Sequence, residues 1–145
     1  MNDEQTAVAV HRFMSERDRL AQHLGIELVE VRPGYCRTTM TMAPHLLNGH
    51  GLLHGAAVFA LADVAFAAAC NSSGQTALAL SMDIHFVATP RPDAVLTAVA
   101  REIRRGSRTA LCRMTVTDDE ENLIAELHGM AYRKGENFLD TEGTE

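Results

Sequence analysis

The sequence predicts an α+β fold in which an antiparallel sheet of five or six strands wraps around one long central helix. Three observations support this class. Residues 55–71 are alanine-rich and apolar, residues 78–86 alternate strictly between apolar and polar side chains, and further strand-like runs follow at short intervals. A helix that is apolar on every side needs protein around it, and strands with one apolar face can provide that cover.

The composition is typical of one globular domain, with 145 residues, 46% of them hydrophobic and 22% charged. Four of the nineteen acidic residues lie in the last ten positions, so residues 1–134 combine thirteen basic with fifteen acidic residues, a net charge of −2. This part of the chain is nearly neutral and has no excess of basic residues, which argues against a nucleic-acid-binding protein. We expect neither a signal peptide nor a membrane span. Three widely spaced cysteines favour a reducing, cytoplasmic location.

The N-terminal region predicts one helix and a β-hairpin. Residues 3–22 place apolar side chains at helical spacing among charges, and Gly25 can end such a helix. Two short strand-like runs follow at 26–32 and 36–42, and Pro33-Gly34 between them is typical of a turn.

The central helix is expected at 55–71, because alanine and leucine favour helix and no proline interrupts the segment. A polar, glycine-rich loop at 44–54 precedes it. The runs 78–86, 94–104, 109–117 and 123–133 then predict four strands of an antiparallel meander. Residues 1–134 would form this single domain, and residues 135–145 an acidic, disordered tail.

Asp63 lies inside the otherwise apolar segment. Burying a carboxylate without a partner costs several kcal/mol, so some role must compensate for it. Either Asp63 caps a neighbouring loop, or it acts in catalysis, where carboxylates with perturbed pKa values concentrate. We favour the catalytic interpretation.

Asn48, His54 and Gly55 lie at or just before the predicted start of the helix. Free backbone N–H groups and the positive end of the helix dipole are found there. Such a place binds anions, or stabilises the oxyanion that forms when a carbonyl is attacked. Taken singly, Gly55 could serve close packing or a tight turn, and Asn48 could be an ordinary turn residue.

Other chemistry has weaker support. His45, His50 and His54 lie in a glycine-rich loop without a cysteine partner, so we expect no metal site. Cys70 lacks an activating base and is expected to be a packing residue. Five arginines around a predicted hairpin turn could bind a phosphorylated ligand or simply face solvent. These are Arg101, Arg104, Arg105, Arg108 and Arg113.

Residues 48–72, NGHGLLHGAAVFALADVAFAAACNS, resemble the signature of the PaaI-type hotdog thioesterases of phenylacetic acid catabolism. The pattern N-x-x-G-x-x-H-G, followed eight residues later by the aspartate of Leu-Ala-Asp, is fairly specific. The resemblance covers residues 10–134 and includes Arg108-Thr109. It implies that Asp63 is the nucleophile or general base and that the Gly55 amide polarises the thioester carbonyl.

The resemblance further implies that Asn48 and His54 orient substrate or water and that Ser81 provides a water-positioning hydroxyl. The implied substrates are aryl- or arylacetyl-CoA thioesters, such as phenylacetyl-CoA or hydroxyphenylacetyl-CoA, with CoA as part of the substrate and no separate cofactor. The leaving thiol has a pKa of about 8.5 and needs little help from a general acid. One carboxylate and an oxyanion site therefore suffice for thioester hydrolysis. One departure is Ala56, where the family usually has a second glycine.

Two other activities fit the same residues. A hotdog hydratase or dehydratase would move a carbon-bound proton, and a non-catalytic protein would bind acyl-CoA without turnover. Release of thiol from acyl-CoA distinguishes a thioesterase from both. In a thioesterase, Arg104, Arg105 and Arg108 are candidate contacts to the CoA phosphates.

Gly55 and Asp63 are eight residues apart on one predicted helix, which separates their backbones by about 12 Å along its axis. One helix cannot easily present both to a single carbonyl. We therefore expect a two-fold homodimer with shared active sites, in which the helix start of one subunit faces Asp63 of the other, and two such dimers forming a tetramer.

Overall fold

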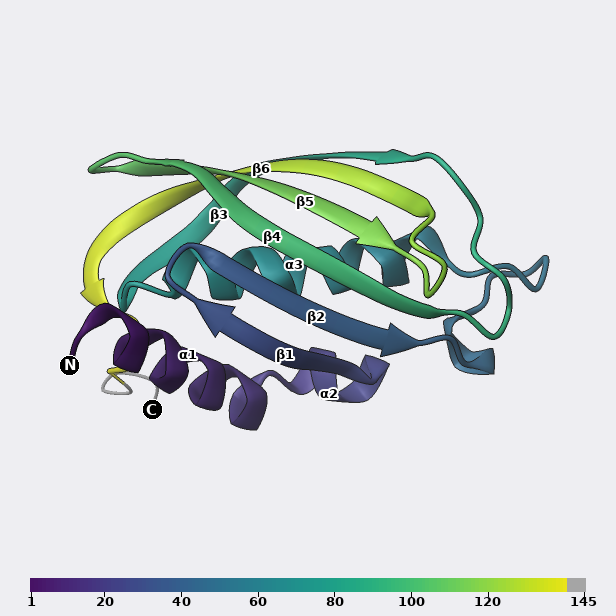
Figure 1. Ribbon diagram of the computed structural model, residues 1–145, viewed down its shortest axis with the longest axis horizontal. Helices are drawn as coiled ribbons and strands as arrows, with labels where there is room; N and C mark the ends of the chain where they lie inside the picture. The colour runs from purple at the N-terminus through teal and green to yellow at the C-terminus, as the bar shows by residue number, and fades with distance from the viewer. Residues whose placement is uncertain (141–145) are drawn as a thin grey trace.

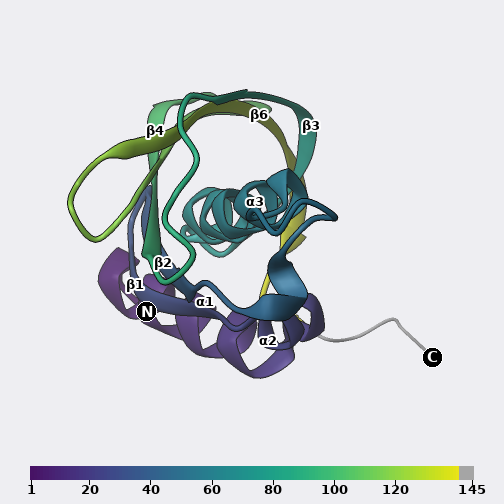
Figure 2. The same ribbon diagram turned by 90° about the vertical axis from the view of Figure 1, so that its right-hand side faces the viewer.

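The computed structural model describes residues 1–140 and consists of a six-stranded antiparallel sheet curved around one long helix, α3 (Gly55–Asn71) (Figure 1). Viewed along α3, the sheet encloses the helix on three sides (Figure 2). The strands are β1 (Ile26–Arg32), β2 (Tyr35–Thr41), β3 (Gln75–Phe86), β4 (Val95–Arg105), β5 (Thr109–Thr117) and β6 (Leu123–Asn137). The predicted fold class, a hotdog fold, is confirmed.

The N-terminal region contains two helices, α1 (Asp3–Arg17) and α2 (Arg19–Leu24), where the sequence predicted one. The break lies at Asp18, which has an extended backbone and a side chain that accepts a hydrogen bond of 3.0 Å from the Ala21 amide. This is the N-cap of a new helix, so the local capping preference of aspartate overrides the helical spacing around it. Gly25 ends α2 in the left-handed conformation.

The central helix begins and ends where the sequence predicted, and two contacts fix its rotation. Thr38 on β2 donates a buried hydrogen bond of 3.0 Å to the Leu61 carbonyl. Phe66 packs against Gly129 on β6, where an added Cβ would lie 2.7 Å from a ring carbon. Glycine at 129 therefore lets the helix approach the sheet closely.

One stripe of α3 remains only partly covered in the single chain, contrary to the expectation that protein surrounds the helix on every side. The stripe consists of Ala56, Ala60, Asp63 and Ala67, of which Ala56 is exposed and the others are half-buried.

No helix in the described part of the chain is long and apolar enough to cross a membrane.

The predicted four-strand meander is wrong in the position of β3. Strands β4, β5 and β6 are consecutive neighbours, but β3 pairs with β6 and lies at the sheet edge. Three of its apolar side chains are exposed in the single chain, with exposed fractions of 54% for Leu78, 60% for Leu80 and 56% for Phe86.

The C-terminal segment differs from the expected acidic tail. Strand β6 continues to Asn137, the Phe138 ring packs 5.2 Å from the ring of Phe13 between centroids, and the Phe138 amide donates to the Gly74 carbonyl. Residues 135–140 thus belong to the folded domain, because Phe138 and Leu139 add apolar contacts to its edge. The rest of the expected tail, 141–145, lies outside the described residues.

Candidate active site

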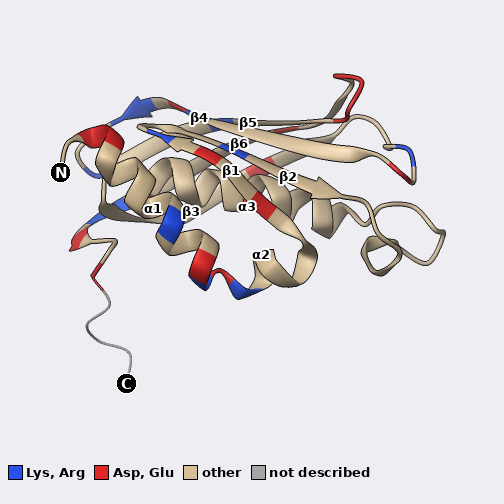
Figure 3. Cartoon of the chain, turned by 60° about the horizontal axis from the view of Figure 1, so that its bottom comes forward, with Lys and Arg blue, Asp and Glu red and all other residues tan. Residues whose placement is uncertain are grey.

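The loop before α3 is held together by Asn48. Its side-chain oxygen accepts hydrogen bonds from the backbone amides of His50, at 2.9 Å, and Leu52, at 3.1 Å. The loop closes through a bridge between Leu47 and Leu53. No charged residue occurs between positions 43 and 62, so the loop and the first two turns of α3 are uncharged (Figure 3). Through its two hydrogen bonds, Asn48 fixes the shape of the loop that leads into the helix.

The first turn of α3 leaves one backbone donor available. The His54 ring nitrogen Nδ1 accepts from the Ala56 amide at 3.0 Å, and the His54 carbonyl accepts from the Ala57 amide at 2.9 Å. The Gly55 amide has no acceptor among residues 1–140. Because the first turn is the positive end of the helix dipole, this free N–H is suited to stabilise negative charge on a ligand oxygen.

Phe86, at the end of β3, packs beside the free amide. An added Cβ at Gly55 would lie 3.2 Å from the Phe86 ring, so a side chain there would press on the ring. The alternation of residues 78–86 puts Phe86 on the apolar face of a predicted strand, but it does not predict that Phe86 lies near the helix start. Only the pairing of β3 at the sheet edge brings it there.

Asp63 lies two turns further along α3 and is half-buried. Burial raises the pKa of its carboxyl above the ordinary value, and the nearby negative charge of Asp18 raises this pKa further. Within residues 1–140, Asp63 forms neither a hydrogen bond nor an ion pair. A structural cap would have such a partner, so the geometry within this part of the chain does not support the loop-anchor interpretation.

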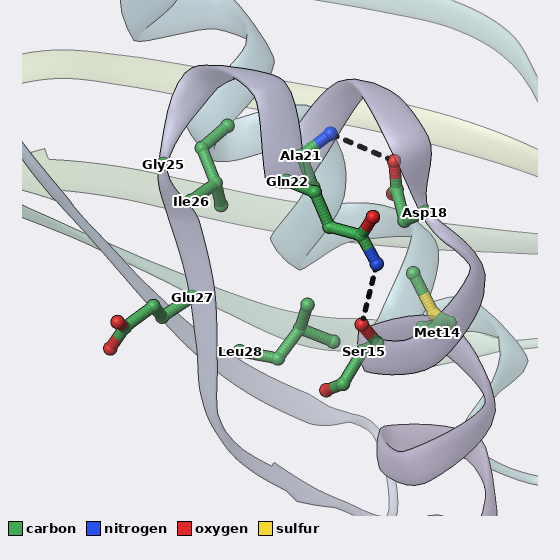
Figure 4. A pocket seen from close by; sticks show the side chains of 9 residues that line it. All are labelled: Met14, Ser15, Asp18, Ala21, Gln22, Gly25, Ile26, Glu27 and Leu28. Carbon is green, nitrogen blue, oxygen red and sulfur yellow. Dashed lines mark hydrogen bonds between the residues drawn. The ribbon is translucent and has the colours of Figure 1, made fainter.

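Asp18 is a neighbour of Asp63 that the sequence analysis missed. Asp18 lines a cavity of about 450 Å³ between α1, α2 and β1 (Figure 4). In the same cavity, the Gln22 side chain donates a hydrogen bond of 3.1 Å to the Ser15 carbonyl. The signal that could have revealed it is the preference of aspartate for the N-cap position. Neither Gly55 nor Asp63 lines this cavity.

The structure brings together only some of the predicted site residues. Asn48, His54 and Gly55 surround the start of α3, whereas Asp63 lies two turns away and forms no hydrogen bond with them among the described residues. Ser81 is exposed on β3, next to a bulge in its pairing with β6.

The arginine-rich turn between β4 and β5 lies at the opposite end of the molecule from the loop before α3 (Figure 1). Arg105 pairs with Glu102 at 2.7 Å, and Arg101 lies over the Tyr35 ring. Within the described residues, Arg104 and Arg108 have no ion-pair partner. Two of the three candidate phosphate contacts thus remain free to bind an anion.

Metal binding and thiol chemistry find no geometric support in residues 1–140. No group of three histidine, cysteine or acidic side chains lies close enough together to hold a metal ion in this part of the chain. The Cys70 and Cys112 sulfurs are buried, 3.3 Å apart. Their hydrogen bond and the burial raise the pKa of Cys70, which agrees with a packing role.

Comparisons with known proteins show which family and which structures this chain resembles. The sequence profile of the thioesterase superfamily matches residues 50–125. The acyl-coenzyme A thioesterase PaaI of Escherichia coli is 35% identical over 122 residues, 84% of this chain and 87% of that protein. A putative esterase of Archaeoglobus fulgidus is 35% identical over 132 residues, 91% of this chain and 86% of that protein.

A solved structure shows the same similarity in three dimensions. The structure of the E. coli PaaI protein from the phenylacetic acid degradation operon superposes with a TM-score of 0.90 at 32% sequence identity, and the match covers 94% of this chain and 99% of that one. The resemblance noted for residues 48–72 is thereby confirmed.

Proposed function

The chain belongs to the thioesterase superfamily and is a thioester hydrolase, and within that activity we propose that its substrates are aryl- or arylacetyl-CoA thioesters, which it cleaves to the free acid and CoA. The observation that carries this proposal is a free backbone N–H at Gly55 combined with an unpaired carboxylate of raised pKa at Asp63. The name of the E. coli relative and the operon of its solved structure support acyl-CoA as substrate and a place in phenylacetate catabolism.

The proposed reaction uses these two groups in turn. Asp63 acts as general base and takes a proton from a water molecule that attacks the thioester carbonyl. Alternatively, it attacks the carbonyl itself and forms a mixed anhydride, which water hydrolyses to the free acid after CoA has left. The Gly55 N–H stabilises the resulting oxyanion. The tetrahedral intermediate collapses, the carbon–sulfur bond breaks, and CoA leaves as a thiolate that is then protonated. Asn48 and His54 orient substrate or water, and Ser81 positions the water.

Gly55 and Asp63 are about 12 Å apart along one helix, too far to act on the same carbonyl. A site shared between two subunits removes this difficulty. We propose a two-fold homodimer in which Gly55 faces Asp63 of the partner subunit, and a tetramer made of two dimers. The exposed apolar edge strand β3, with Leu78 and Leu80, supports pairing with a second copy, because such an edge is otherwise prone to association.

A cytoplasmic location also belongs to the proposal. All three cysteines are buried free thiols, a state that a reducing compartment maintains.

A thiol-release assay over a panel of acyl-CoA thioesters tests the proposed activity. We expect phenylacetyl-CoA and hydroxyphenylacetyl-CoA to be hydrolysed with higher kcat/KM than acetyl-CoA. Binding without thiol release would contradict the proposal and support a non-catalytic protein. Addition of water to an unsaturated acyl-CoA, again without thiol release, would instead support a hydratase.

Mixing two weakly active variants in equal amounts tests the shared site. Asn48→Ala damages the helix start and Asp63→Asn removes the carboxylate, so each protein alone should be weakly active. After subunit exchange, half of the dimers are mixed, and each has one intact site of two, so about a quarter of full activity should return. No recovery after confirmed exchange would show that each site lies within one subunit.

A further inference from the structure

An apolar pocket of about 320 Å³ opens beside the first turn of α3. Leu20 and Leu24 of α2 form one wall, Leu46 of the preceding loop forms another, and Ala56 and Ala60 form the floor. The pocket is separate from the larger cavity that Asp18 lines.

We propose that this pocket receives the acyl group of the thioester and that α2 selects it through Leu20 and Leu24, an inference that rests on the function proposed above. The first argument is position. His54 and Ala56, the residues on either side of Gly55, both line the pocket. A carbonyl group that accepts from the free Gly55 amide would therefore lie next to two residues that line the pocket.

The second argument is chemistry. The lining contains no charged residue, and its only polar side chains are His45 and His54. Such a surface suits an apolar acyl group and not the phosphates at the nucleotide end of CoA. Leu20 is 62% exposed although it is large and apolar, so a ligand in the pocket would cover a side chain that now faces solvent.

The third argument is size. A cavity of about 150 Å³ accommodates benzene, so this pocket has room for an aromatic ring with its methylene group, or for an acyl chain of medium length. The small side chains of the floor provide that room. The methyl group of Ala56 lies in the lining, so it occupies part of the space beside the first turn and limits the bulk of the acyl group.

The test compares kcat/KM for phenylacetyl-CoA with kcat/KM for acetyl-CoA in the full-length protein. Leu20→Ala removes part of the wall, so this ratio should fall about tenfold, within the range expected when a hydrophobic pocket loses contacts. Ala60→Leu fills the floor and should lower the same ratio, because only the larger acyl group needs the space. The matched control is Val8→Ala on α1, which is 63% exposed and does not line the pocket.

The outcomes separate this inference from the proposed function. If the wild-type protein releases no thiol from any acyl-CoA, the proposed function fails. If the wild-type protein is active but Leu20→Ala keeps the wild-type ratio, the acyl group binds elsewhere and this inference is overturned. A fall in the ratio for Leu20→Ala, with Val8→Ala unchanged, supports it, and a correctly folded Ala60→Leu protein with an unchanged ratio contradicts it.

Discussion

The first turn and the middle of α3 belong to one helix but offer opposite chemistry. The first turn has neutral surroundings, a histidine cap and one free backbone donor at Gly55. The middle contains Asp63, whose carboxylate is half-buried and has no partner among residues 1–140. One region can stabilise negative charge and the other can accept a proton. Because about 12 Å of helix separates them, the proposed complete site combines the first turn of one copy with the middle of α3 in another.

The largest effect is expected from Asp63→Asn, which removes the proton acceptor and leaves the first turn intact. Thiol release should fall by at least about 100-fold, the scale for losing a positioned base. Near-normal turnover would contradict a catalytic role for Asp63.

The same variant also tests the raised pKa of Asp63. The folded protein binds the proton more tightly than the unfolded chain, so ionisation of Asp63 opposes folding once the pH exceeds the raised pKa. Asp63→Asn should therefore have a higher Tm than the wild type at pH 7. This difference should disappear below the ordinary carboxyl pKa of 3.8, where Asp63 is protonated in both states. A lower Tm at pH 7 would argue against the raised pKa.

His54→Ala should have the next largest effect and acts on the first turn alone. It removes the acceptor of the Ala56 amide, so unfolding free energy should fall by about 1 kcal/mol and kcat/KM by about tenfold. His54→Asn supplies a good N-cap and should restore the Tm. If it also restored full activity, the role of His54 would be limited to capping.

Arg108→Ala should produce a several-fold effect, outside both regions of α3. If this side chain binds the CoA phosphates, KM should rise more than kcat falls, because the phosphates are remote from the reacting carbonyl. Arg12→Ala, on the exposed face of α1, is the control for loss of one positive charge. Equal KM values for the two variants would identify Arg108 as an ordinary surface residue.

Asp18→Asn should have the smallest effect, and it sharpens the description of the middle of α3. Asparagine keeps the N-cap of α2 and removes the negative charge that raises the pKa of Asp63. The acid limb of the kcat/KM profile should therefore move to lower pH, by less than about one unit. An unchanged limb, or a shift to higher pH, would contradict the coupling of the two carboxylates.

Local signals explain the parts of the fold that could be predicted. The bounds of α3 and β5 follow from residue composition and from flanking glycines and an acidic turn, which act over a few residues. The position of β3 could not be predicted in this way, because strand order depends on which distant segment pairs with an edge. The break at Asp18 was missed because helical spacing continues on both sides of it.

The same distinction applies to the candidate site. Asn48, His54, Gly55 and Asp63 lie within one short segment, so a motif could identify them together. Asp18 is the N-cap of α2, Leu20 lies in α2 and Phe86 lies in β3. Only the folded chain brings these three residues near α3. The N-cap preference of aspartate could have identified Asp18 as a capping residue but not as a neighbour of Asp63, and a single leucine or phenylalanine is ordinary in its own segment.

The separate capping of α2 has a consequence for how such proteins diverge. This helix has only six residues, begins at its own N-cap Asp18 and ends at Gly25, and presents Leu20 to solvent. Substitutions at Leu20 leave the buried sheet and the residues of the first turn in place. With α2 forming the acyl pocket wall, acyl preference can evolve in a short exposed helix while the hydrolytic residues and the hydrophobic core stay the same.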